Sequence, residues 1–177
     1  KKANELNVPT LSYPEMLGVI SKNKYTIAIS GAHGKTTTTA MIGKILMDAN
    51  LDPTIIVGSL LKDSKSNFVA GKGGYFVVEA CEYKKSFLEI NPKIIVITNI
   101  DNDHLDYYKN LNNIKKAFAE FVSKLPEGGY LICDPNDKNL KEVIKKTKAK
   151  IIDYTKIIAG FNLKIPGQHN IKNAKAA

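Results

Sequence analysis

Arginine is absent from this chain of 177 residues, so all 26 basic side chains are lysines. With 17 acidic residues, the formal net charge at pH 7 is +9, a balance that would suit a nucleic-acid-binding protein. Arginine, however, is the usual bidentate reader of guanine and a frequent phosphate ligand in such proteins. Its absence argues against a dedicated nucleic-acid module, and we expect no nucleic-acid partner.

Long apolar runs and cysteines are also scarce. No stretch is long enough to cross a bilayer, and residues 1–4 do not resemble the start of a signal peptide. We therefore expect a cytoplasmic protein with no membrane partner. The two cysteines, Cys81 and Cys133, lie in apolar segments and lack the spacing of paired metal ligands. The sequence thus indicates two buried thiols, without a disulfide framework or a zinc site.

Short apolar segments rich in isoleucine, valine and tyrosine predict β-strands. They occupy residues 25–30, 54–58, 75–80, 93–99, 130–133 and 150–153. Helical spacing of apolar residues between them is clearest at 111–125 and recurs at 137–147, where lysines would form the polar face. The alternation predicts an α/β fold with a mostly parallel, doubly wound sheet flanked by helices.

The stretch AISGAHGKTTTTAM at residues 28–41 follows the first predicted strand. Its glycines permit a sharp turn whose N–H groups face an anion, and the helix that follows adds its positive end. Lys35 offers a cation to phosphate, and Thr36 offers a hydroxyl to Mg²⁺. The strict P-loop pattern requires glycine at position 29, which is Ile29. A glycine turn whose threonines cap a helix therefore stays open as an alternative.

Polar side chains also follow two other predicted strands. Glu79 ends the third strand, and the segment TNIDNDH at 98–104 follows the fourth. Because ligands of open parallel sheets bind beyond the carboxyl ends of the strands, we expect Lys35, Glu79 and His104 to converge. Taken singly, Glu79 is equally well explained as a solvent-exposed carboxylate at a strand end. His104 taken singly is better explained as a surface or structural histidine. Together they predict a site for a nucleoside triphosphate and magnesium.

Three segments together resemble the central ATP-binding domain of the Mur ligases, enzymes of peptidoglycan synthesis. They are SGAHGKTTTTAM, VVEACEYKKSFLEINPKIIVITNIDNDHLDYY and IPGQHNIKNA, beginning at Ser30, Val77 and Ile165. The resemblance covers nearly the whole chain and implies a P-loop-containing α/β domain. The family loop has the same shortened G-x-x-G-K-T form, which answers the objection at Ile29.

The resemblance implies a role for each matching residue. Lys35 would bind the β and γ phosphates, in a loop whose other nucleotide contacts come from Gly31, Ala32, His33, Gly34 and Thr37. Thr36 and Glu79 would hold magnesium, His104 would hold a second magnesium, and the catalytic set would be Lys35, Glu79 and His104. The remaining contacts would be Asn99 in the cleft and, at the adenine, His169, Asn170 and Asn173.

The family chemistry implies phosphorylation of a carboxylate by ATP and attack of an amine on the acyl phosphate. The segment EACEYKKSF is most similar to the branch that joins L-alanine to UDP-N-acetylmuramate. Phe118 also fits this branch, because it stands where other branches have a modified lysine and the alanine-adding branch has none. A murein tripeptide-recycling ligase, a folylpolyglutamate synthase and a noncatalytic nucleotide- or polyanion-binding module stay open as alternatives.

The resemblance also implies a domain organisation. Residues 1–22 would be the end of, or the linker from, a preceding UDP-binding domain, and residues 23–177 the central ATP-binding domain. The amino-acid-binding domain would be absent, so we expect the fragment alone to be inactive. Two departures stand out: Lys175 occupies an expected helix-packing position, and the connection before Ile165 is shorter than in the family.

Overall fold

A seven-stranded sheet forms the centre of the molecule, with strand order β3-β2-β4-β1-β5-β6-β7. The computed structural model describes residues 2–61, 65–158, 160 and 162–177. The strands are β1 Tyr25–Ser30, β2 Thr54–Leu61, β3 Ser66–Val69, β4 Tyr75–Glu79, β5 Ile94–Ile97, β6 Tyr130–Cys133 and β7 Lys150–Asp153. β3 pairs antiparallel with β2, and the other pairings are parallel. The predicted α/β fold is therefore confirmed, and each expected strand is present.

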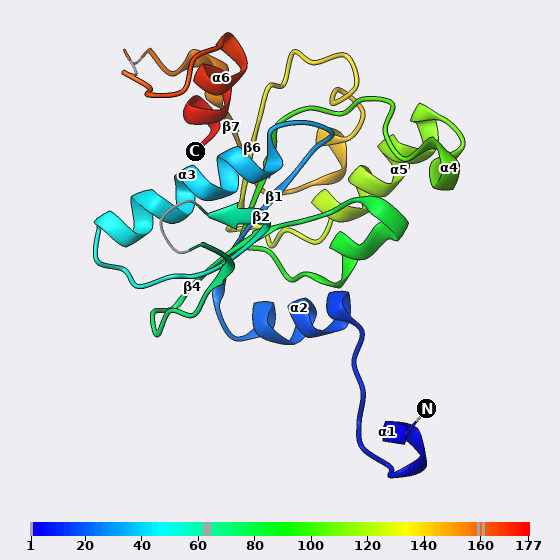
Figure 1. Cartoon of the computed structure of the whole chain (residues 1–177). Helices are drawn as coiled ribbons and strands as arrows, with labels where there is room; N and C mark the ends of the chain where they lie inside the picture. The colour runs from blue at the N-terminus through cyan, green and yellow to red at the C-terminus, as the bar shows by residue number, and fades with distance from the viewer. Residues whose placement is uncertain (1, 62–64, 159, 161) are drawn as a thin grey trace.

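Helices cover both faces of this sheet (Figure 1). On one face lie α3 (Lys35–Asp48) and α6 (Gln168–Ala176), and on the other lie α2 (Tyr13–Lys22) and α5 (Leu111–Val122). Within β1, Ile27 and Ile29 pack on the α3 side and Ala28 on the α5 side. Because both faces are buried, the strands are apolar at consecutive positions. The shorter elements are α1 Lys2–Glu5, η1 Tyr83–Glu89, α4 Leu105–Tyr108, η2 Ile144–Lys146 and η3 Tyr154–Lys156.

Helix α5 confirms the clearest helical pattern of the sequence, although it ends at Val122 and not at residue 125. Its Asn110 cap accepts a hydrogen bond from the backbone N–H of Asn113. The apolar stripe packs on η1, where the ring of Phe87 stacks on Phe121 at 4.4 Å between centroids. The same ring meets Phe118 edge-on at 5.3 Å. These aromatic contacts fix η1, and with it the chain that follows Glu79, against the sheet.

Replacing Phe121 by alanine is expected to lower the free energy of unfolding by about 3–5 kcal/mol, because the side chain is fully buried in this cluster. Urea unfolding monitored by circular dichroism measures the change. Lys116→Ala on the exposed side of α5 is the control and should stay within about 0.5 kcal/mol. A loss below about 1 kcal/mol at Phe121 would contradict the described packing.

The helix predicted over residues 137–147 is not formed. These residues make consecutive turns that end in the 3₁₀ turn η2. Asp137 accepts a hydrogen bond from the backbone N–H of Asn139, and Asn139 Nδ2 donates to the carbonyl of Ile100 at 2.7 Å. Such side-chain bonds to the backbone compete with a helical ladder. The apolar spacing still identified the buried positions, which are Leu140 and Val143.

Two further expectations need revision. Cys133 is buried as expected, but Cys81 is exposed, and neither forms a disulfide. Residues 13–22, expected to lie within a linker, form helix α2, which begins with a capping box between Ser12 and Glu15. The helix buries Leu17 against the core. The assignment of residues 1–22 to a preceding domain stays a prediction. No helix in the described part of the chain has the length and apolar character required to span a membrane.

Candidate functional site

The glycine-rich loop joins β1 to α3 at the carboxyl edge of the sheet. Gly31 has φ of 135° and Gly34 has φ of 85°, values that disfavour any other residue. A Cβ atom on Gly31 would lie 2.2 Å from Thr98 Oγ1, and one on Gly34 would lie 2.5 Å from Asn173 Oδ1. Ile29 is fully buried within β1. The turn therefore begins two residues later than the strict P-loop pattern requires.

Helix α3 begins directly at Lys35, and its cap residue Gly34 makes no side-chain capping bond. The N–H groups of its first turn and the positive end of the helix thus remain suited to an anion. In the alternative interpretation, threonines would cap this helix. Thr36 instead donates its hydroxyl to Glu79, and Thr39 donates to the carbonyl of Lys35. The local geometry therefore favours a phosphate loop over a capped glycine turn.

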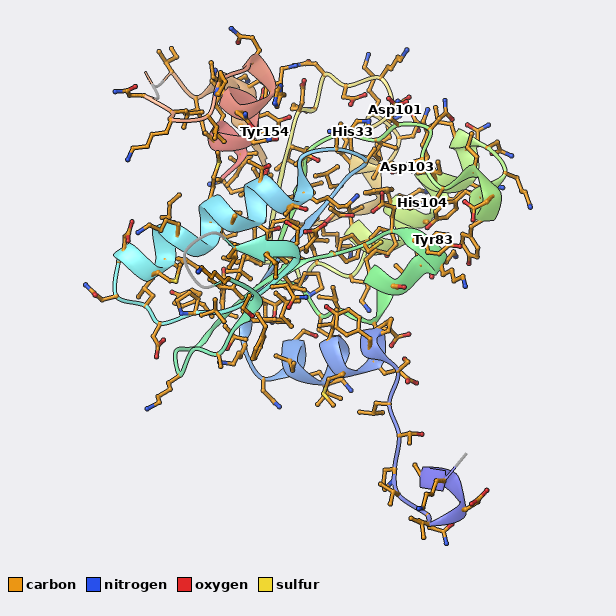
Figure 2. The ribbon with its side chains drawn as sticks, viewed as in Figure 1. His33, Tyr83, Asp101, Asp103, His104 and Tyr154 are labelled. Carbon is orange, nitrogen blue, oxygen red and sulfur yellow. The ribbon has the colours of Figure 1, made fainter. Side chains whose placement is uncertain are left out.

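The segment after β5 holds this loop in shape. Asn99 accepts at Oδ1 from the backbone N–H of His33 at 3.1 Å, and its Nδ2 donates to the carbonyl of His33 at 2.9 Å. The carbonyl of Asn99 also accepts from the N–H of Ala32. Figure 2 shows His33, Asp101, Asp103 and His104 along the same edge of the sheet. Asn99 thus positions the backbone of the loop, and its expected contact with nucleotide in the cleft stays a prediction.

Glu79, at the end of β4, lies beside the start of α3. Its Oε2 accepts from Thr36 Oγ1 at 2.9 Å and from the backbone N–H of Gly58 at 2.7 Å. β4 is the direct neighbour of β1 in the sheet, and this pairing places the carboxylate next to the loop. The two oxygen donors expected to share a magnesium ion are therefore adjacent.

Lys35 does not extend into solvent from the loop. Its ammonium donates to the carbonyl of Gly31 at 2.5 Å and to Glu82 Oε1 at 3.2 Å. The side chains are 13% exposed for Lys35 and 2% exposed for Glu82. A carboxylate to which the sequence analysis gave no role is therefore the acidic partner of the lysine expected to bind phosphate.

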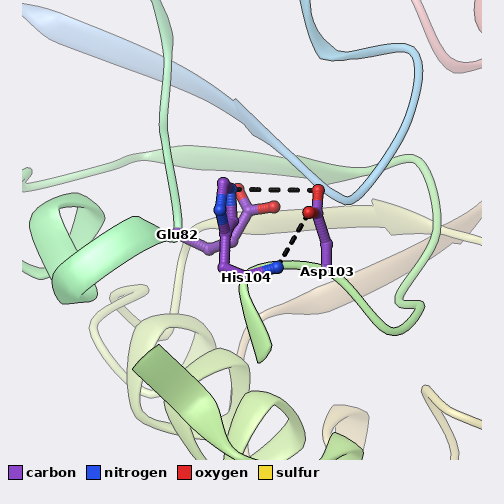
Figure 3. A group of neighbouring side chains, drawn as sticks. All are labelled: Glu82, Asp103 and His104. Carbon is purple, nitrogen blue, oxygen red and sulfur yellow. Dashed lines mark hydrogen bonds and ion pairs between the residues drawn. The ribbon is translucent and has the colours of Figure 1, made fainter. Parts of the chain in front are cut away.

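His104 lies in a second group of potential ligands. One ligand atom each from Glu82, Asp103 and His104 lies within 4.8 Å of the others, as Figure 3 illustrates. The ring of Tyr83 packs against the imidazole at 4.8 Å between centroids. Glu82 and Asp103 were not among the residues expected at the site. Their acidic character and their closeness in sequence to Glu79 and His104 were the only available signals.

The C-terminal helix α6 packs against α3 and brings the third motif to the loop. Asn173 is buried, and its side chain faces Gly34. Asn170 is also buried and donates from Nδ2 to the carbonyl of Pro166. His169 is exposed in the first turn of α6. Thr37 lies in the wall of an apolar cavity of about 1020 Å³ between α3, β2 and the segment before α6. Asn173 therefore reaches the loop, whereas His169 faces solvent.

Local contacts raise three pKa values around the histidine. A hydrogen bond to the Asp106 carboxylate raises the pKa of the Tyr83 hydroxyl. Burial, followed by the charge of Glu82, raises the pKa of Tyr108, whose hydroxyl donates to the carbonyl of Glu82. Burial also raises the pKa of the Cys81 thiol. All three groups therefore stay protonated near neutral pH and add no negative charge to the site.

A parallel α/β sheet with a glycine loop, a lysine and a threonine–carboxylate pair at its carboxyl edge defines a domain of the P-loop class. The family model described as "Mur ligase middle domain" matches residues 29–157. The chain belongs to the Mur ligase family.

Two curated relatives share one name, UDP-N-acetylmuramate–L-alanine ligase. A UDP-N-acetylmuramate–L-alanine ligase of Caldicellulosiruptor bescii is 43% identical, and one of Clostridium kluyveri is 41% identical. Each match covers 99% of this chain and 45% of the relative, so the chain spans less than half the length of these proteins. Each alignment extends over 204 positions, 27 more than the 177 residues of the chain. The relatives therefore have residues within the aligned region that this chain lacks.

Solved structures share the fold. A UDP-N-acetylmuramate-alanine ligase from Thermotoga maritima superposes with a TM-score of 0.79 at 25% identity, covering 99% of this chain and 45% of that one. A UDP-N-acetylmuramate:L-alanyl-gamma-D-glutamyl-meso-diaminopimelate ligase from Neisseria meningitides gives a TM-score of 0.83 at 22% identity, covering 99% and 66%. Both confirm the P-loop-containing α/β architecture of a Mur ligase central domain.

Proposed function

We propose that this chain is the ATP-binding domain of a ligase that joins L-alanine to UDP-N-acetylmuramate in the cytoplasm. The observation that carries the proposal is the convergence of Lys35, Thr36 and Glu79 at the start of α3. Relatives more than 40% identical that carry this enzyme's name support the choice of reaction. Because they are more than twice as long, we assign the activity to the enzyme of which this domain is a part. We propose no nucleic-acid or membrane partner.

The loop would bind the triphosphate of ATP. Backbone N–H groups of residues 31–37 and the positive end of α3 would surround the phosphates, and the Lys35 ammonium would neutralise their β and γ oxygens. Asn99 would keep the loop open for this contact through its two bonds to His33. Asn173, which faces Gly34, would lie toward the nucleoside, and His169 and Asn170 would join it from the same helix.

The residues beside the loop also suit magnesium. Thr36 Oγ1 and Glu79 Oε2 are adjacent hard oxygen donors, the ligand type that Mg²⁺ prefers. We propose that they hold one ion and that His104 serves a second. When bound, magnesium would neutralise the charge that develops on the transferred phosphoryl group.

The reaction requires little covalent participation by the protein. The carboxylate of UDP-N-acetylmuramate would attack the γ phosphorus of ATP to give an acyl phosphate and ADP. The free amine of L-alanine would then attack the acyl carbon, forming the amide, releasing phosphate and losing a proton. The domain would contribute alignment and charge neutralisation around closely spaced anions, which is where most phosphoryl-transfer catalysis arises.

Phe118 favours the alanine-adding branch over branches that use a modified lysine at this position. Its side chain is 1% exposed and packs edge-on against Phe87 inside the core. A lysine there would require a different helix packing.

A noncatalytic polyanion-binding module is the second candidate, favoured only by the net charge of +9.

An assay of the full-length protein separates these possibilities. Phosphate release is measured with ATP, Mg²⁺ and UDP-N-acetylmuramate, and either L-alanine or the murein tripeptide is added as the second substrate. The proposal predicts stoichiometric phosphate and amide formation with L-alanine. Turnover with the tripeptide alone would identify the recycling ligase. Salt-sensitive anion binding without turnover would identify the polyanion-binding module.

A further inference from the structure

We propose that Glu82 is a positioning residue for Lys35: its buried carboxylate holds the lysine ammonium at the glycine-rich loop, where the phosphates of ATP are expected. Lys35 would contact phosphate, and Glu82 would act only through Lys35. This role is separate from magnesium binding. The pairing of the two side chains is a feature of the structure, whereas its effect on the reaction rests on the proposed function.

Three acceptors hold the ammonium of Lys35, as many as it has N–H donors. Two are the carbonyls of Gly31 at 2.5 Å and Ala32 at 3.4 Å, and the third is Glu82 Oε1 at 3.2 Å. The two carbonyls lie three and four residues before the lysine and belong to the same loop. Because lysine is a point charge on a flexible stem, these local contacts do not tie it to the sheet. Glu82, which follows β4, is the acceptor that does so.

The burial of Glu82 gives this ion pair its significance. The side chain is only 2% exposed, and Lys35 is the one group bonded to its carboxylate in the described part of the chain. A buried carboxylate is costly unless a cation compensates it. Apolar residues of similar volume often replace buried ion pairs without loss of stability. Stability alone therefore gives little reason for a carboxylate at this position, whereas control of the Lys35 ammonium does.

The two lysines nearest to Glu82 in sequence have other partners. The ammonium of Lys84 lies over the ring of Tyr83, 5.4 Å from its centroid. Lys85 is paired with Glu120 on α5 at 2.8 Å. The carboxylate is thus paired with a lysine 47 residues earlier in the chain and not with either neighbour.

Glu82 is itself fixed from two directions. Its carbonyl accepts from the backbone N–H of Lys85 at 2.9 Å and from the hydroxyl of Tyr108. Tyr108 is 3% exposed and belongs to the core beside α5. A chain of contacts therefore connects the core, through Glu82, to the Lys35 ammonium. A charge held in this way needs no reorganisation when negative charge develops on the phosphates.

A double-mutant cycle on the full-length enzyme tests the positioning role, with phosphate release as the readout. Glu82→Ala should lower kcat about tenfold, within the range of couplings between contacting residues. Glu82→Gln keeps an oxygen acceptor and should recover part of this loss. In the Lys35→Ala background, Glu82→Ala should change kcat by less than about twofold, because the residue that it positions is gone. Glu120→Ala, which removes an exposed carboxylate, is the control and should leave kcat within about twofold.

Urea unfolding of the same variants tests the pairing without any substrate. Lys35→Ala leaves a buried carboxylate without its cation, so the urea midpoint should fall. Adding Glu82→Gln to Lys35→Ala should restore most of that shift, because an amide is less costly to bury than a charge. The same substitution in the control position, Glu120→Gln, should restore nothing.

Each outcome bears on one part of the proposal. An equal loss of kcat for Glu82→Ala in both backgrounds would show that the residue acts on the fold and not through Lys35. Unchanged kcat in Glu82→Ala would likewise overturn the positioning role. A urea midpoint that stays low after Glu82→Gln is added would overturn the pairing.

Two further results are covered. If Glu82→Ala does not fold, as judged by circular dichroism, Glu82→Gln replaces it in the kinetic cycle, and its loss should again be confined to enzyme that retains Lys35. Absence of turnover in the unmodified enzyme would refute the proposed ligase function and the effect on catalysis together. The unfolding cycle would still decide whether Glu82 and Lys35 are paired.

Discussion

Lys35→Ala is expected to lower the ATP-dependent rate of the full-length enzyme by about 10²–10³-fold, the usual effect of removing one preorganised charge from a transition state. The lysine is the first residue of α3, and its ammonium already lies inside the loop. Without it, the accumulated negative charge of the phosphates would lose its nearest side-chain cation. Steady-state kinetics with ATP, UDP-N-acetylmuramate and L-alanine give the measurement.

Lys44→Ala is the matched control for this prediction. Lys44 belongs to the same helix but pairs with Asp48 at the far end, on the surface. Its replacement should leave the rate within about twofold, since exposed ion pairs contribute little. Equal rates for Lys35→Ala and the unmodified enzyme would show that phosphate is bound elsewhere.

Gly31→Ala should both destabilise the fold and abolish ATP binding. The residue has φ of 135°, and an added Cβ would approach Thr98 Oγ1 to 2.2 Å and the carbonyl of Asn99 to 2.8 Å. Backbone strain of this kind costs about 1–3 kcal/mol before the steric clash is relieved. Relief requires the loop to move away from the segment after β5, which would destroy the geometry of the phosphate site. Urea unfolding and calorimetric titration with ATP measure the two effects.

Gly128→Ala provides a control of the same chemistry. A Cβ there meets nothing within 4 Å, so the substitution should change stability by less than about 1 kcal/mol and leave ATP binding intact. If Gly31→Ala bound ATP as tightly as this control, the described loop conformation could not be the one that holds phosphate.

The sheet could be predicted from sequence because its strands are buried on both faces and therefore apolar at successive positions. β3 escaped prediction for the opposite reason: its four residues, Ser66–Val69, lie at the sheet edge and are largely exposed. The failure at 137–147 has another cause. Apolar spacing reports which side chains are buried, but it does not register the competition from Asp137 and Asn139 for the backbone.

Much of the candidate site followed from one rule, that polar residues after parallel strands meet at one edge. Of the residues expected to converge, Glu79 lies beside Thr36 at the loop, whereas Lys35 and His104 approach each other through Glu82. The rule gave no reason to place Glu82 there, because this residue lies beyond the end of β4, just before an irregular turn in which Lys84 and Lys85 adopt left-handed conformations. Neither residue type signals such a turn. The same limitation hid the proximity of Glu82 to Lys35, which lies 47 residues earlier in the chain.

The central claim is that the triphosphate of ATP lies on the loop from Gly31 to Thr36. A crystal structure of the full-length protein with Mn²⁺ and a non-hydrolysable ATP analogue tests it most directly, because anomalous scattering locates the metal and the phosphates are visible beside it. The account predicts the γ phosphate within hydrogen-bonding distance of the Lys35 ammonium, with Mn²⁺ at Thr36 and Glu79. A triphosphate bound at another surface, with Lys35 still paired to Glu82, would contradict it.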